Sequence, residues 1–183
     1  MVVFMKEKYG VIFLDVDGVL NNRSTTEKTP ENFYGVEDFL IERLKQIVDS
    51  VDFNVDIVLS SDWKDFWSTD RSLCKPDALY LNEKLANFGL EIIDRTYEKR
   101  RTWRANGVYD YIVAHENITN YVILDDYVFN FDASPVYTHY IKTDSKVGLS
   151  DEDVFKASAI LNSDMKLFCD VEEIDMEMLN VEV

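Results

Sequence analysis

The chain has 183 residues, of which 46% are hydrophobic and 13% aromatic, and 35 acidic against 19 basic residues give a formal net charge of −16. This composition is typical of a globular protein rather than a disordered one, and the length suits a single domain. Because such a charge repels polyphosphate, we expect no nonspecific binding along long nucleic acids.

The cysteine pattern and the N-terminus predict the compartment. Cys74 and Cys169 lie far apart with no C-x-x-C spacing, which argues against a zinc site or a disulfide framework. The stretch MVVFMKEKYG lacks the long apolar segment of a signal peptide, and no run of about 18 apolar residues is present to span a bilayer. We therefore expect a cytoplasmic protein with no membrane partner.

Along the chain, short apolar runs alternate with stretches of helical periodicity, as in βαβ units. The predicted strands are residues 9–14, 55–59, 91–93, 121–124 and 136–141. The predicted helices are residues 36–50, 79–88, 104–116 and 151–161, the last with Ser150 as N-cap and Asp153 at its third position. The alternation predicts an α/β fold with a mainly parallel sheet covered by helices on both faces.

Two segments fit neither helix nor strand. Residues 21–35 are polar and contain Pro30 and several threonines, which predicts a loop or a short hairpin flap over the strand ends. The acidic segment 169–183 is expected to form a small helix or to fray. Since the chain has no repeat and no linker, we expect residues 1–183 to form one domain.

Polar residues follow three of the predicted strands where each strand ends. They are Asp15 and Asp17 after the first strand, Ser60 and Ser61 after the second, and Asp125 and Asp126 after the fourth. Ligands of parallel α/β folds bind beyond these carboxyl ends. Four carboxylates brought together there need a divalent cation, and an all-oxygen set suits Mg²⁺ better than zinc.

A hydroxyl and a cation complete the candidate site. Ser61 offers a hydroxyl to an anionic oxygen, and Arg104 offers a fixed fork of donors to a phosphate. Each also fits a structural role, Ser61 as an N-cap and Arg104 as one charge on a solvated helix face. Trp63, close to the serine pair, fits either stacking on a base or packing in the core.

The order of these features resembles a known family. "FLDVDGVL", "IVLSSDW", Arg104 and "VILDD" resemble the four motifs of the haloacid dehalogenase (HAD) superfamily of phosphohydrolases, over residues 11–161. More narrowly, "LDVDGVLN", "RANGVYDYI", "YVILDDY" and "IKTDSKVGLSDEDV" are similar to the capless HAD domain of Swiss-army-knife RNA repair proteins. The resemblance implies a Rossmannoid three-layer α/β/α sandwich with little or no cap and therefore an open site.

The resemblance also implies residue roles. Asp15 would be the nucleophile that forms an aspartyl-phosphate, and Asp17 the general acid and then base. Ser61 and Arg104 would bind the phosphoryl group, with Ser60 and Lys99 as alternatives.

For the metal, the resemblance implies ligation of Mg²⁺ by Asp15, by the backbone carbonyl of Asp17, by Asp125, and by Asp126 directly or through water. Relatives often carry a further aspartate shortly after the acidic pair, where this chain has "YVFNF". Asp132 follows but is poorly placed for that role.

The sequence thus predicts a Mg²⁺-dependent phosphomonoesterase acting on a phosphorylated small molecule, a nucleotide or a nucleic-acid terminal phosphate. A non-catalytic module that presents an acidic face to a basic partner is the first alternative, and the paired Asp15 and Asp17 argue against it. A phosphotransferase, the second alternative, would use the same residues, and only product analysis separates it from a hydrolase.

Overall fold

A computed structural model describes residues 7–169 and contains one five-stranded sheet in the order β3-β2-β1-β4-β5. Every neighbouring pair in this sheet is parallel. The strands are β1 (Gly10–Leu14), β2 (Val55–Leu59), β3 (Ile92–Arg95), β4 (Asn120–Asp125) and β5 (Tyr140–Lys142). The predicted parallel α/β architecture is confirmed.

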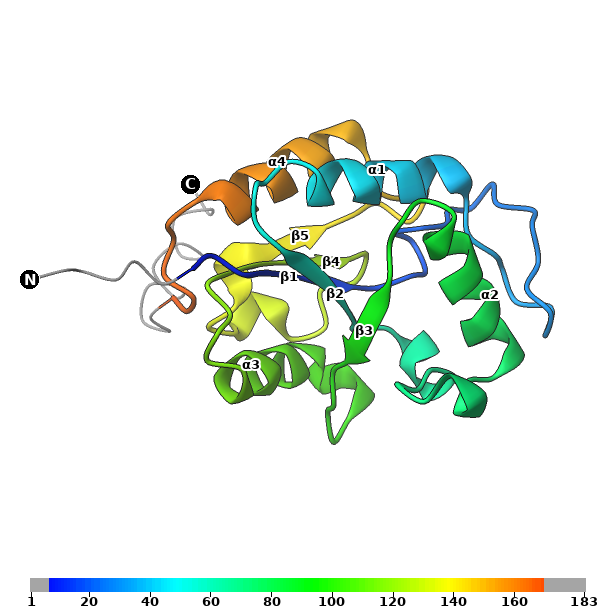
Figure 1. Cartoon of the computed structure of the whole chain (residues 1–183), viewed down its shortest axis with the longest axis horizontal. Helices are drawn as coiled ribbons and strands as arrows, with labels where there is room; N and C mark the ends of the chain where they lie inside the picture. The colour runs from blue at the N-terminus through cyan, green and yellow to red at the C-terminus, as the bar shows by residue number, and fades with distance from the viewer. Residues whose placement is uncertain (1–6, 170–183) are drawn as a thin grey trace, which may run out of the picture.

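The helices cover both faces of the sheet (Figure 1). They are α1 (Asp38–Val48), α2 (Pro76–Ala86), α3 (Arg104–Ala114) and α4 (Asp151–Asn162). Helices α1, α2 and α4 contribute to one apolar cluster, and α3 contributes to a second cluster on the opposite face. This arrangement is the three-layer α/β/α sandwich that the sequence predicts.

The central position of strand β1 in the sheet explains why its sequence is continuously apolar. Ile12 and Leu14 belong to the cluster beneath α1 and α4, while Val11 and Phe13 belong to the cluster beneath α3. Because successive side chains of a strand point to opposite faces, a central strand that is covered on both sides needs apolar residues at every position.

The predicted strand 136–141 is wrong over most of its length. Residues Tyr137–His139 form a 3₁₀ helix, and the strand begins only at Tyr140. Pro135 has no N–H for a sheet ladder, and the N–H groups of Tyr137 and His139 bond locally to the carbonyls of Ser134 and Val136. Helix α2 begins at Pro76, earlier than predicted, because proline is well suited to the first helical position.

The predicted flap is a short hairpin beside the carboxyl ends of the strands. Lys28 and Tyr34 form an isolated antiparallel bridge, and Gly35 N–H donates to the Glu27 carbonyl at 2.8 Å. The Tyr80 hydroxyl of α2 donates to the Glu27 carboxylate at 2.6 Å. A Cβ on Gly35 would lie 2.6 Å from that hydroxyl oxygen, so a larger residue there would push the Tyr80 side chain away from the hairpin.

Within residues 7–169, no helix has the length and apolarity that crossing a membrane requires. The predicted acidic tail lies, apart from Cys169, outside the described residues.

Candidate active site

Three carboxylates meet at the carboxyl ends of β1 and β4. Asp15 directly follows β1 and is 5% exposed, and Asp125 is the last residue of β4 and is 1% exposed. The Asp15 N–H donates to the Leu124 carbonyl at 2.9 Å, which ties the two strand ends together. Oxygen atoms of Asp15, Asp125 and the half-buried Asp126 all lie within 4.8 Å of one another.

Arg104 places a buried positive charge against this group. The side chain is 2% exposed, and its Nη1 lies 2.7 Å from Asp125 Oδ2 and 3.1 Å from Asp15 Oδ2. Its Nη2 lies 3.3 Å from Asp62 Oδ1. Arg104 is the first residue of α3, so the helix start aims the guanidinium at the end of the sheet. One guanidinium offsets only part of the charge of three carboxylates.

Burial and the remaining negative charge together raise the pKa values of the carboxyl groups. Burial, and then repulsion from Asp125, raise the pKa of Asp15, while Arg104 and a hydrogen bond from Ser61 oppose the shift. Burial likewise raises the pKa of Asp125 against the opposing charge of Arg104. A divalent cation would relieve this repulsion, and three carboxylates at one point are the oxygen donors that Mg²⁺ prefers. The residues therefore fit the predicted metal.

The two serines after β2 face different ways. The Ser61 hydroxyl hydrogen-bonds the Asp15 carboxylate and also accepts from Trp63 N–H at 3.4 Å as the N-cap of the 3₁₀ helix Asp62–Asp65. Ser60 Oγ instead accepts from Thr96 Oγ1 at 3.4 Å. Ser61 is thus the hydroxyl beside the candidate nucleophile, and its role toward phosphate stays a prediction.

Asp17 lies apart from the three carboxylates. Its exposed side chain accepts two hydrogen bonds, one at Oδ2 from Trp63 Nε1 at 2.9 Å and one at Oδ1 from Asn21 Nδ2 at 2.8 Å. This position is compatible with the predicted acid and base role, in which only the backbone carbonyl of Asp17 would bind metal. The sequence indicated neither donor, although Trp63 stands close to the serine pair.

The turn after β1 requires a glycine. Gly18 has φ +74°, and a Cβ there would lie 2.4 Å from Asp126 Oδ2. The Gly18 carbonyl accepts from Thr143 Oγ1 at 2.8 Å, and Thr143 N–H donates to the Asp125 carbonyl at 3.0 Å. Thr143, which follows β5, therefore holds the two aspartate-bearing turns together, a role that the sequence did not reveal.

Two residues that the sequence offered as possible site residues lie outside the group of Asp15, Asp125 and Asp126. Lys99 is exposed and lines a separate hollow with Tyr97 and Trp103, so the arrangement favours Arg104 over Lys99. Asp132 lies in the 3₁₀ helix Phe131–Ala133 and is absent from the three-carboxylate group among the described residues.

A cleft of about 970 Å³ opens beyond the strand ends, far larger than a phosphate group needs. Asp17 and Asp126 line it on the side of the carboxylates, and Phe33 and Tyr34 of the hairpin line another side. Its lining also includes three cationic side chains, those of Arg23, Lys64 and Arg101. The cleft is thus open to a substrate larger than a simple phosphate ester.

Residues 11–154 match the model of one protein family, described as the HAD domain in Swiss Army Knife RNA repair proteins. The match includes every predicted site residue from Asp15 to Asp126. None of the curated proteins and none of the solved structures that were compared matches the chain.

Proposed function

The chain belongs to the family of HAD domains in Swiss Army Knife RNA repair proteins, and from this premise we propose that it is a Mg²⁺-dependent phosphomonoesterase working through an aspartyl-phosphate. One observation carries the proposal. The buried Asp15 carboxylate contacts Arg104 and Ser61 and lies within 4.8 Å of the Asp125 and Asp126 carboxylates, and Asp126 lines an open cleft.

Asp15 is suited to nucleophilic attack. A carboxylate oxygen of Asp15 forms a bond to phosphorus while the ester P–O bond breaks, and the leaving oxygen takes a proton from Asp17. In the second step Asp17 takes a proton from water as that water attacks phosphorus. This releases inorganic phosphate and restores the Asp15 carboxylate.

The other residues orient the Asp15 carboxylate and neutralise the negative charge of the reacting groups. Arg104 holds the Asp15 carboxylate in place, since its Nη1 donates to both Asp15 and Asp125. Ser61, whose hydroxyl hydrogen-bonds the Asp15 carboxylate, would bind a phosphoryl oxygen. Asp15, Asp125 and Asp126, with the Asp17 carbonyl, would hold Mg²⁺, which supplies positive charge where two anions must approach each other.

The proposed substrate is a phosphate at the end of a nucleotide or nucleic acid. The RNA repair context of the family and the size of the cleft both support a substrate larger than phosphate. A phosphotransferase would use the same residues, and adding an alcohol acceptor and analysing the products separates the two reactions. A non-catalytic module would have no need for the two donors that fix the Asp17 carboxylate.

The test is phosphate release from an aryl phosphate with and without Mg²⁺, for the native protein and for Asp15→Asn. We expect metal-dependent release that Asp15→Asn abolishes and that Asp49→Asn, at the exposed end of α1, retains. If Asp15→Asn keeps even a tenth of the native rate, a barrier change of only about 1.4 kcal/mol, Asp15 is not the nucleophile.

A further inference from the structure

Basic and aromatic residues are concentrated between β3 and α3, although the chain as a whole is strongly acidic. Residues 95–104 read RTYEKRRTWR and hold five of the 19 basic residues and one of the 35 acidic ones, a local net charge of +4. Arg104 in this segment is buried in the carboxylate site, whereas most of the others face solvent.

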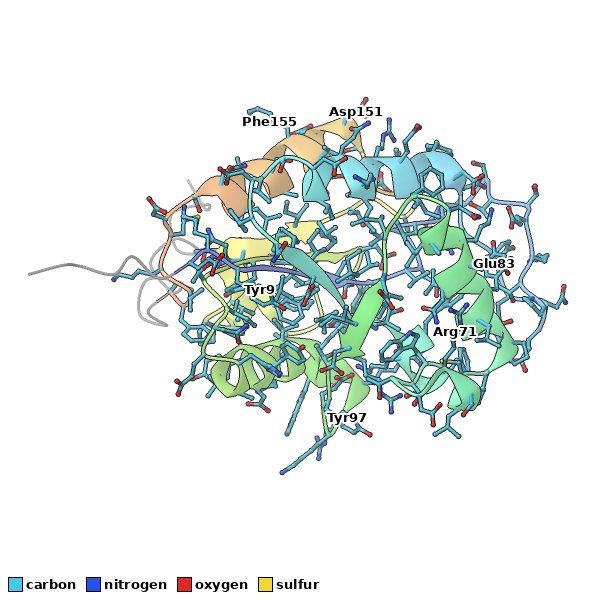
Figure 2. The ribbon with its side chains drawn as sticks, in the orientation of Figure 1. Tyr9, Arg71, Glu83, Tyr97, Asp151 and Phe155 are labelled. Atoms are coloured by element: carbon cyan, nitrogen blue, oxygen red, sulfur yellow. The ribbon has the colours of Figure 1, made fainter. Side chains whose placement is uncertain are left out.

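We call the outward-facing side chains of this segment the β3–α3 patch: Tyr97, Lys99, Arg100, Arg101 and Trp103. Tyr97 is 76% and Trp103 41% exposed. Together with Lys99 they line a hollow of about 590 Å³. Figure 2 labels Tyr97 on the loop that leads from β3 to α3, at the edge of the molecule. The patch therefore offers two aromatic rings around a surface hollow.

Two of the three cations of the patch have no carboxylate partner among the described residues. Among residues 7–169, neither Lys99 nor Arg100 forms an ion pair with a carboxylate, and the Arg100 guanidinium lies 4.9 Å from the Trp103 ring centre. Arg101 pairs with Asp62. Positive charges beside exposed aromatic rings are the combination that binds single-stranded nucleic acid, because bases stack on the rings and phosphates face the cations.

The patch adjoins the cleft. Glu98 lines both the cleft and the hollow, and Arg101 lines the cleft. Asp62, the partner of Arg101, also contacts Arg104, which in turn contacts Asp15. A strand lying on the patch can therefore place its end in the cleft.

We propose that the β3–α3 patch binds the few nucleotides of a single-stranded nucleic acid that precede its terminal phosphate, with a base stacked on Tyr97 or Trp103 and phosphodiesters facing Lys99 and Arg100. This inference rests on the proposed function and narrows its substrate to a polynucleotide end. The carboxylates of an acidic peptide would match the cations but would not stack on the aromatic rings, whereas each nucleotide carries both a phosphate and a base. The acidic surface elsewhere limits contact to this patch.

The first test measures binding without turnover. A fluorescent single-stranded oligonucleotide with a terminal phosphate is titrated with Asp15→Asn protein and followed by anisotropy. Adding Tyr97→Leu or Trp103→Leu should weaken binding about tenfold, the size expected for one lost stacking contact. Phe155→Leu on α4, which like Tyr97 is 76% exposed, should leave binding unchanged (Figure 2).

Salt dependence tests the cations separately. Each phosphate contact of a single strand contributes about 0.7 to the slope of log K against log salt concentration. Lys99→Ser should therefore lower that slope by about 0.7, whereas Arg71→Ser, an exposed arginine before α2, should not change it.

The outcomes keep this inference distinct from the proposed function. If the patch variants bind the oligonucleotide as tightly as their parent, or if an acidic peptide competes as well as an unlabelled oligonucleotide, the patch proposal is overturned. Patch-dependent binding without phosphate release by the native protein would contradict the phosphatase and support the patch. In an active enzyme, Tyr97→Leu should lower kcat/KM far more for the phosphorylated oligonucleotide than for a nucleoside monophosphate, which lacks the preceding nucleotides.

Discussion

Asp15 and Asp17 stand two positions apart in the chain but lie in different environments. Asp15 is buried beside Arg104 and two other carboxylates, whereas Asp17 is exposed and receives one N–H donor at each oxygen. A nucleophile must be held toward phosphorus, and an acid must reach the leaving group. The two environments suit these two roles.

Trp63 should act as a positioning residue for Asp17, because its indole N–H donates to Asp17 Oδ2 at 2.9 Å. Proton donation matters most for a poor leaving group, and general acid catalysis is worth about 10²-fold or more. We therefore predict that Trp63→Phe lowers kcat at least tenfold for an alkyl phosphate and far less for an aryl phosphate with a good leaving group.

Trp67→Phe is the matched control for that variant. Trp67 is as buried as Trp63, but its indole N–H donates to Asn82 Oδ1 at 3.1 Å and it does not line the cleft. An equal loss of kcat on both substrates in Trp63→Phe would mean that Trp63 supports the fold only.

At the residue scale, the sequence was sufficient where strand ends determine position. Asp15, Ser61, Asp125 and Asp126 come together because their strands are adjacent and parallel. The alternation of strands and helices predicts the parallel direction but not the order of the strands. The donors to Asp17 could not be predicted in this way. Their contacts depend on side-chain directions within turns, and a strand and helix pattern does not specify these directions.

At the element scale, α4 begins as its sequence indicates. The Ser150 hydroxyl accepts from Asp153 N–H and the Asp153 carboxylate accepts from Ser150 N–H, a complete capping box. We predict that Ser150→Ala lowers the free energy of unfolding by about 1 kcal/mol, measured by urea denaturation. Ser158 lies within the same helix and is not part of this capping box, so Ser158→Ala should lower the free energy of unfolding less. Equal effects would contradict the capping role.

The elements that were mispredicted share a cause. Val136, Tyr137 and Thr138 are residue types that favour strands, but Pro135 and local hydrogen bonds make Tyr137–His139 a 3₁₀ helix. Helix α2 begins at Pro76, before the first residue of its apolar repeat. Proline suits the first position of a helix whether or not its side chain faces the core. Hydrophobic periodicity reports which residues are buried, and backbone hydrogen bonds determine where an element begins.

On the scale of the whole molecule, the core contains a histidine that resists protonation. His139 is 2% exposed and stacks on Tyr121 with ring centres 4.1 Å apart. Its polar neighbour is Thr138 Oγ1 at 3.1 Å. Burial lowers the pKa of His139 to about 4, so the folded state holds the neutral ring.

This lowered pKa predicts loss of stability in acid. Above about pH 6.5, the pKa of an unfolded histidine, the ring is neutral in both the folded and the unfolded state. Between about pH 6.5 and the folded pKa of about 4, only the unfolded state binds the extra proton, so the stability of the fold decreases as the pH falls. From pH 7 to pH 5 the His139 contribution should destabilise the fold by about 2 kcal/mol.

The variant His139→Phe keeps a ring against Tyr121 and removes the titrating group. Urea denaturation at pH 7 and pH 5 should show a smaller pH difference in stability for this variant than for the native protein. An unchanged difference would mean that other groups govern the acid sensitivity.

The net charge of the whole chain does not predict the charge of each part of its surface. A net charge of −16 predicts a surface that repels nucleic acid, yet residues 95–104 carry a local charge of +4 beside the cleft. Composition averages over the surface, whereas recognition depends on which side chains the fold gathers in one place. The sequence predicted the parallel sheet and the carboxylates at its edge, and it shows the basic run of residues 95–104, but only the fold places that run beside the cleft.

Detection of phosphate on Asp15 would demonstrate the aspartyl-phosphate intermediate itself. In Asp17→Asn the base for the second step is missing, while an aryl phosphate with a good leaving group needs little acid in the first step. We predict that mixing this variant with such a substrate and Mg²⁺, followed by acid quenching and peptide mass spectrometry, detects phosphorylated Asp15. Turnover by the native enzyme with no phosphorylated peptide in the variant, together with activity in Asp15→Asn, would contradict the account.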